Sequence, residues 1–251
     1  MNTNFGNKQL SADDRLAFKF ADESYKAPDE RKDIGDFEYD KEMSNIDTAV
    51  YHNHKTKQTR IGNRGSVSKT DWLQTDLTGI APGRENSDKR HQRVLKQTVD
   101  AHEKYGYDVM SHGHSMGQSV SNYATEKLGD NDWMLGNIGF NPGVSQAGRA
   151  NYFSKTRRAC RSKNPPKYCS KTTNIYEKGD YVSNQNALCG YLTFGLGPRA
   201  LCGKSVGYGT GKFYDHRKPS RWYMKPFSRT LPVRMFSNGT QHSLKSFHVD
   251  E

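Results

Sequence analysis

Short runs of alternating or continuous apolar residues are separated by stretches with helical periodicity. In Ser11–Phe20 the apolar side chains share one helical face, and Ser11 or Asp13 stands where an N-cap belongs. Ser87–Tyr105 has the same periodicity and stops before Gly106, a common helix terminator. Both stretches are predicted to be helices.

The strand-like runs lie between the predicted helices. Strands are predicted at Thr48–Asn53 and Thr59–Ser66, which a polar turn joins as a hairpin, and at Tyr107–His112, Gly136–Asn141, Thr173–Tyr176 and Leu231–Phe236. Further helices are predicted at Val67–Leu77 and from about Ser115 to Leu128. This alternation predicts an α/β fold with a mainly parallel central sheet and helices on both faces.

Three stretches stand apart from this scheme. Residues 1–45 are predicted to form a helical and acidic segment that packs on a core domain of residues 46–251. Residues 154–171 form a basic insertion that contains two prolines. Residues 190–223 are rich in glycine and aromatic residues, show no clear period, and receive no secondary-structure prediction.

The composition limits where the chain is expected to work. Only 33% of the residues are hydrophobic, the mean hydropathy is −0.97, and no run approaches the roughly 18 apolar residues of a membrane span. The first residues contain no apolar core of a secretory signal. A soluble protein is therefore expected, either cytoplasmic or associated with a virion.

The net charge of +11 is concentrated in one half of the chain. Residues 131–251 contain 19 Lys+Arg against 6 Asp+Glu, a net charge of +13, whereas residues 1–130 contain 19 against 21. Such asymmetry favours an anionic neighbour: a phospholipid surface, nucleic acid or an acidic protein. A solvated surface that only keeps the protein soluble is an equal alternative.

All four cysteines are in the second half: Cys160, Cys169, Cys189 and Cys202. Their spacing does not match that of zinc sites. Two local disulfides are one alternative, and reduced thiols are the default expectation for a chain without a signal sequence.

The motif with the clearest chemistry is Gly113-His114-Ser115-Met116-Gly117, between a predicted strand and a predicted helix. This is the G-x-S-x-G pattern of a nucleophile elbow, whose serine sits in a sharp turn. Glycines on both sides permit the strand and the helix to lie close together. The N–H groups that follow, beginning with Met116, are placed to stabilise an oxyanion.

A nucleophilic serine needs a histidine base, a carboxylate and a second oxyanion donor. In α/β-hydrolases the order along the chain is Ser, Asp, His. Asp180 follows the Thr173–Tyr176 strand, and His242 follows a strand and a turn; His248 is the second choice, while His216 is flanked by charges. The loop that contains Ser66 is the candidate for the second donor.

Five segments in this order resemble the class 3 lipases, in particular lipase-like α/β-hydrolases of large DNA viruses and microbes. The segments are RGSVSKTDWLQTDL (64–77), GHSMG (113–117), GFNPG (139–143), GDYVS (179–183) and HSLKSF (242–247). The resemblance covers about residues 40–250.

The resemblance implies a role for each matching residue. Ser115 would be the nucleophile, Asp180 the orienting acid and His242 the base. Ser66 and Met116 would form the oxyanion hole. Residues 67–76 would form a lid region that carries Trp72, and Asp76 would hold the Ser66 hydroxyl.

The sequence departs from the family at Gln118, where the family usually has glycine. A larger side chain there is expected to loosen helix–strand packing or to fill part of the pocket. Ser183 replaces a frequent proline, and the strand before Arg64 is unusually polar. These departures leave room for a narrowed pocket or for lost activity.

The sequence thus predicts a serine esterase or lipase that cleaves carboxylic esters, acylglycerol or phospholipid, through a Ser-His-Asp triad, without metal or organic cofactor. Its expected partners are the lipid or other ester and an anionic membrane surface. A protease or thioesterase on the same scaffold is one alternative. The other is a virion-associated protein that binds nucleic acid or capsid through its basic face, with weak or lost activity.

Overall fold

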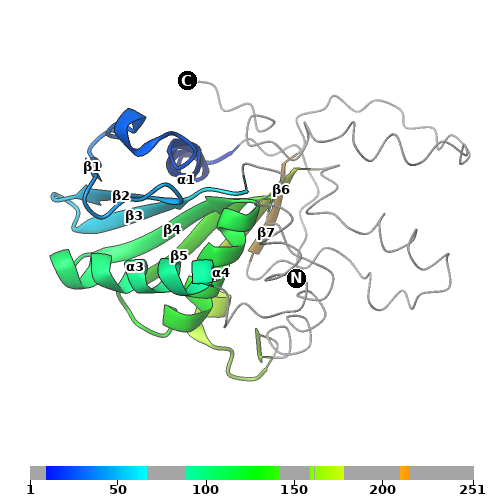
Figure 1. The fold of residues 1–251 in the computed structure, drawn as a ribbon. Coiled ribbons are helices and arrows are strands. Elements are labelled where there is room, and N and C mark those ends of the chain that lie inside the picture. The colour runs from blue at the N-terminus through cyan, green and yellow to red at the C-terminus, as the bar shows by residue number, and fades with distance from the viewer. Residues whose placement is uncertain (1–9, 67–88, 142–158, 161, 178–209, 215–251) are drawn as a thin grey trace, which may run out of the picture.

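The computed structural model describes residues 10–66, 89–141, 159–160, 162–177 and 210–214 (Figure 1). The strand predicted at Leu231–Phe236 and the helix predicted at Val67–Leu77 lie outside these residues. The described part is built on one seven-stranded sheet whose strands follow one another in chain order.

The bounds of the strands agree closely with the sequence pattern where a pattern existed. The strands are β1 (Glu38–Asp40), β2 (Thr48–Asn53), β3 (Gln58–Asn63), β4 (Asp108–His114), β5 (Met134–Phe140), β6 (Thr172–Glu177) and β7 (Thr210–Tyr214). β1, β2 and β3 pair antiparallel, and every pair from β3 to β7 is parallel. The predicted hairpin and the mainly parallel sheet are therefore confirmed.

Two strands were not predicted. β1 lies in the N-terminal acidic segment, for which no strand was predicted, and it extends the edge of the hairpin. β7 lies in the glycine- and aromatic-rich stretch that gave no period, and it pairs along its whole length with β6. In both places pairing with a neighbouring strand decides the structure, and a local pattern does not reveal it.

Helices cover both faces of the sheet (Figure 1). α3 (Lys89–Tyr105) and α4 (Met116–Leu128) contact each other on one face, and α1 (Ala12–Glu23) lies against β3, β4 and β5 on the other. Crossovers between neighbouring parallel strands are right-handed, so strands added in one direction place their connecting helices on the same face. The predicted α/β class with helices on both faces is confirmed.

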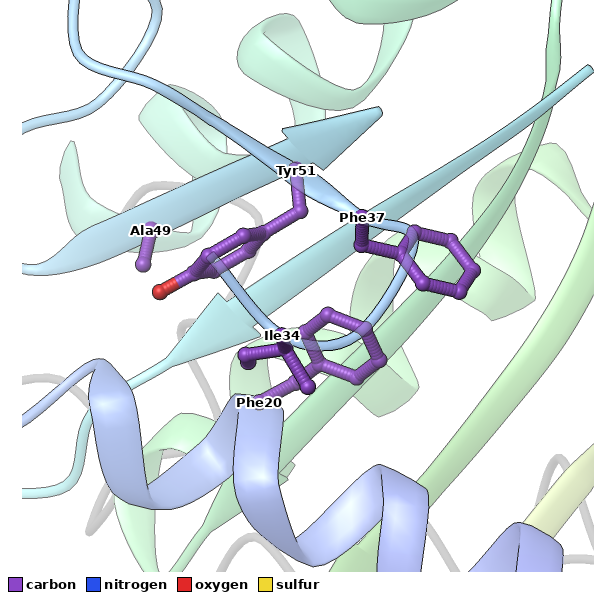
Figure 2. Packing of buried hydrophobic residues seen from close by; sticks show 5 residues of the cluster. All are labelled: Phe20, Ile34, Phe37, Ala49 and Tyr51. Atoms are coloured by element: carbon purple, nitrogen blue, oxygen red, sulfur yellow. The ribbon is translucent and has the colours of Figure 1, made fainter. Parts of the chain in front are cut away.

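α1 is fixed at its start and along its buried side. Ser11 is the N-cap, and it forms a reciprocal capping box with Asp14. The buried side contributes Phe20, whose ring packs edge-on against Phe37 and Tyr51 with centroid separations of 5.1 and 5.2 Å (Figure 2). The helix therefore belongs to the core of the described fold; the boundary near residue 45 stays a prediction.

The cysteine expectation is corrected at one pair. Cys160 and Cys169 form a disulfide, with their Cα atoms 5.6 Å apart. The short 3₁₀ turn Lys167–Cys169 returns the chain to Cys160 within the usual Cα separation for a bridge. Reduced thiols are thus the wrong expectation for these two residues; Cys189 and Cys202 lie outside the described residues.

Candidate active site

Ser115 occupies a strained turn between β4 and α4. Its backbone has φ 56° and ψ −121°, a conformation that a residue with a Cβ seldom adopts. The Ser115 N–H donates to the Phe140 carbonyl at 3.0 Å, which ties the turn to the end of β5. Strain of this kind costs about 1–3 kcal/mol and is retained chiefly at functional sites. The predicted elbow geometry is present.

The glycines of the motif permit the close packing that the turn requires. A Cβ at Gly117 would collide with the carbonyl groups of Asn63 and Arg64, and a Cβ at Gly113 would collide with the backbone of Gly117. The start of α4 therefore lies directly on the end of β3. This contact brings the loop after β3 to the nucleophile turn.

The loop Arg64–Ser66 lies against Ser115, as the proposed oxyanion hole requires. A methyl group at Gly65 would be 3.1 Å from the Ser115 Cβ and 2.9 Å from the His114 carbonyl oxygen. The Ser66 hydroxyl is buried and has no hydrogen-bond partner within the described part of the chain. A buried hydroxyl without a partner is costly unless a ligand supplies one.

Arginines around Asp47 hold this loop in place. The Arg64 guanidinium donates to Asp47 at 3.0 Å, and the Arg64 N–H donates to the Asp47 carbonyl at 3.0 Å. Arg93 reaches the other carboxylate oxygen at 3.3 Å, and the buried Arg90 donates to the Arg64 carbonyl. The carboxylate thereby connects the start of β2 with the loop and α3.

Tyr25, which follows α1, also reaches the site, and sequence reasoning missed it. Its hydroxyl oxygen accepts from the Gly65 N–H at 2.8 Å and lies 2.7 Å from Nδ1 of His114. Burial raises the pKa of Tyr25 to about 12, so the hydroxyl keeps its proton and can donate a hydrogen bond to the imidazole. No local motif marks Tyr25, because its partners are distant in sequence.

Met116 begins α4 and therefore has the place that the prediction gave it. The first N–H groups of a helix have no acceptor within the helix, and they carry partial positive charge. The Ser115 carbonyl already accepts from the N–H groups of Gln118 at 3.1 Å and Ser119 at 3.3 Å. The Met116 N–H stands directly after Ser115, at the start of this helix.

The remaining predicted residues, Asp180, His242, Trp72 and Asp76, lie outside the described residues. β6 nevertheless ends at Glu177, three residues before Asp180. Phe140 of β5 pairs with His114 on one side and with Ile175 on the other, so β4 and β6 end at the same edge of the sheet. The chain enters the Asp180 segment from the edge that carries Ser115.

Gln118, where glycine was expected from the resemblance, packs between α4 and the sheet without loosening the helix. Its side chain is fully buried between α4 and the sheet, over Gly139. Its amide nitrogen donates to the side chains of Asn137 and Asn174. The expected loosening is therefore wrong, because Gly139 leaves the space that the longer side chain occupies.

Among the described residues, no group of three or more His, Cys, Asp or Glu side chains is arranged to hold a metal ion. None of the described helices combines the length and the apolar character that a membrane crossing requires.

Comparison with known proteins gives similarity only at the level of structures. No protein-family model matches the sequence, and no curated protein matches it. The structure is similar to Lip2 lipase from Yarrowia lipolytica, with 15% identity, a TM-score of 0.47 and 82% of each chain covered. It is also similar to a triacylglycerol lipase from Penicillium expansum, with 16% identity, a TM-score of 0.46, and 82% of this chain and 81% of that chain covered. Both TM-scores are below 0.5, so the site is assigned from this chain's own residues.

Proposed function

We propose that the protein is a serine hydrolase that cleaves carboxylic esters, with Ser115 as the nucleophile. One observation supports this most: the strained Ser115 turn lies directly against the Gly65–Ser66 loop, whose buried hydroxyl has no partner among the described residues. A nucleophile beside an unused hydrogen-bond donor suits acyl transfer, in which an oxyanion forms next to the nucleophile.

In the proposed reaction, His242 takes the proton of the Ser115 hydroxyl while its oxygen attacks the ester carbonyl carbon. Asp180 holds the imidazole in the required tautomer. The carbonyl oxygen becomes an oxyanion that accepts hydrogen bonds from the Met116 N–H and from Ser66, each worth about 3 kcal/mol of barrier. The bond to the alcohol oxygen then breaks, and the imidazolium protonates the leaving alcohol.

Deacylation repeats these steps with water. His242 takes a proton from water as the water oxygen attacks the acyl-enzyme carbonyl, and the bond to the Ser115 oxygen breaks with return of the proton. The carboxylic acid leaves and the free serine is restored. No step draws on a metal or an organic cofactor.

The proposed substrates are acylglycerols or phospholipids, and two features of the sequence support them. The net charge of +13 in residues 131–251 suits an enzyme that works at an anionic lipid surface. Residues 67–76, which include Trp72 and Asp76, are proposed to cover the acyl site as a lid. Co-sedimentation with liposomes tests the surface proposal: binding should rise with anionic lipid content, and binding independent of that content would contradict it.

Hydrolysis of nitrophenyl esters of increasing chain length tests the function. Wild type should release nitrophenolate, and Ser115→Ala should lose at least about a thousandfold of that rate. Ser119→Ala is the matched control, because Ser119 lies one turn further along α4 and is also half-buried. Equal rates for Ser115→Ala and wild type would contradict the proposal, whereas a preference for thioesters or peptides would reassign the substrate.

A further inference from the structure

The face of α4 that lies on the sheet is polar, whereas a helix–sheet interface is usually apolar. The buried residues Gln118, Ser121 and Thr125 recur at helical spacing along it. Opposite them, the sheet contributes five buried polar side chains: Asn63, Ser111, Asn137, Thr172 and Asn174. Hydrogen bonds connect the two sets across the interface, and Asn137 also donates to Thr172 within the sheet.

Gln118, in the first turn of α4, has three side-chain hydrogen-bond partners close to the nucleophile turn. Its Nε2 donates to Oδ1 of Asn137 on β5 at 2.8 Å and to Oδ1 of Asn174 on β6 at 2.8 Å. It also reaches Oδ1 of Asn122, one turn along the same helix, at 2.9 Å. One side chain thus links the first turn of α4 to two strands beyond the one that precedes Ser115.

A glutamine over Gly139 carries an energetic cost. The Gln118 Oε1 atom is buried and has no hydrogen-bond partner among the described residues, which carries a desolvation cost. A methionine has about the same length and no unpaired polar atom of its own, but it would take this donor away from the buried Oδ1 atoms of Asn137 and Asn174. Hydrogen bonds have a preferred angle, so those of Gln118 restrict the rotation and the axial position of the helix more tightly than the apolar contacts of a methionine would.

The orientation of the helix matters because the backbone of Gln118 is hydrogen-bonded to the backbone of Ser115. The Gln118 N–H donates to the Ser115 carbonyl at 3.1 Å, and Ser115 is held at φ 56°. β6, on which Asn174 lies, leads into the segment that contains Asp180. A shift of the first turn of α4 would therefore move Ser115 relative to β6, the strand that precedes Asp180.

We propose that Gln118 is a positioning residue: its bonds to Asn137 and Asn174 hold the first turn of α4 so that the Ser115 hydroxyl keeps its reactive direction. The role rests on the proposed function of Ser115 as nucleophile. Gly139 makes room for the glutamine, since a Cβ there would collide with its side chain.

The test compares Gln118→Met with Thr125→Val. The Thr125 hydroxyl accepts from Asn137 at 2.6 Å and belongs to the same buried network, but it lies nearly three helical turns away from Ser115. Both variants lose hydrogen bonds of this network and keep nearly the same volume. The rate of covalent labelling by a fluorophosphonate, and kcat and KM for nitrophenyl butyrate, are measured where circular dichroism shows both variants folded.

Gln118→Met should be labelled at least about tenfold more slowly and lose kcat in the same proportion with unchanged KM, since small displacements of a reacting group cost large factors in rate. Thr125→Val should stay within about twofold of wild type even if its melting temperature falls. Equal labelling rates for Gln118→Met and Thr125→Val would overturn the positioning role.

Two further outcomes are separated by design. If Gln118→Met does not fold, Asn174→Leu removes an acceptor on β6 while Gln118 stays in place, and the same slowing is expected; a normal rate in that variant would overturn the role. A wild-type chain that is not labelled at Ser115 would overturn the proposed function itself, and with it this role.

Discussion

The Tyr25 hydroxyl accepts a hydrogen bond from the Gly65 N–H at 2.8 Å, which connects the end of α1 with the loop beside Ser115. α1 lies on one face of the sheet, and α4, which carries the elbow, lies on the other. The contact therefore passes around the carboxyl edge of the sheet. It makes the N-terminal segment part of the candidate site.

Tyr25→Phe is predicted to lower both stability and reactivity. The ring stays, but the Gly65 N–H and Nδ1 of His114 lose their partner, at a cost of about 1–3 kcal/mol in the free energy of unfolding. The loop beside Ser115 is then held less firmly, so fluorophosphonate labelling of Ser115 should slow. Urea denaturation and labelling rates measure the two effects.

Tyr107→Phe is the control for Tyr25→Phe. The Tyr107 hydroxyl lies 2.9 Å from Nδ1 of His54 and 3.3 Å from the Lys57 amine, at the opposite end of β4 from Ser115. This variant should lose a comparable amount of stability and keep the labelling rate. Slowing of equal size in both variants would show that Tyr25 acts only through general stability.

Ser115→Gly is predicted to be more stable than Ser115→Ala. Relief of the strain at φ 56° contributes about 1–3 kcal/mol, and the larger chain entropy of unfolded glycine offsets about 0.5–1 kcal/mol of it. The net gain is on the order of 1 kcal/mol, to be measured by urea denaturation. Equal stability of the two variants would mean that the turn is not strained in solution.

His112→Phe is predicted to make stability less sensitive to acid. His112 is buried, stacks on Phe20 with ring centroids 5.2 Å apart, and lies 3.2 Å from the Ile138 carbonyl. Burial and, to a smaller extent, the charge of Arg60 hold its pKa well below the ordinary value of 6.5. His112 therefore stays neutral in the folded protein while the unfolded chain takes up a proton.

The sign follows from this difference in bound protons. Below about pH 6.5 the unfolded state binds more protons than the folded state. The free energy of unfolding should therefore decrease as the pH decreases, by about 1.4 kcal/mol per pH unit for this group. His52, whose pKa burial also lowers, adds to the slope in wild type and remains in the variant. Urea denaturation from pH 7.5 to 5 should give a shallower slope for His112→Phe; identical slopes would contradict the assignment.

The elements that could be predicted from the sequence are those with a local sequence signal. The capped helix at α1, the hairpin of β2 and β3, and the strand–turn–helix around Ser115 all have local signals: a cap, alternation around a polar turn, and G-x-S-x-G. The structure has each of them within a few residues. β1 and β7 depend on pairing with a neighbour, and for that reason the pattern missed them.

Tyr25 and Gln118 show why parts of the site could not be predicted. Tyr25 reaches Gly65 and His114 only because α1 crosses the sheet near its carboxyl edge. Gln118 stands where the resemblance implies a glycine, but the course of its side chain depends on Gly139, on a different strand. Both roles arise from tertiary contacts. Asp180 and His242 stay predictions, as do the lid residues Trp72 and Asp76.

Fluorophosphonate labelling followed by peptide mapping tests the central claim most directly. Wild type should gain one covalent adduct, on the peptide that contains Ser115; Ser115→Ala should gain none, and His242→Ala should react at least about a hundredfold more slowly. Ser119→Ala, the neighbouring serine on α4, should be labelled like wild type. Absence of an adduct from folded wild-type protein, or an adduct that persists in Ser115→Ala, would contradict the assignment of Ser115 as the nucleophile.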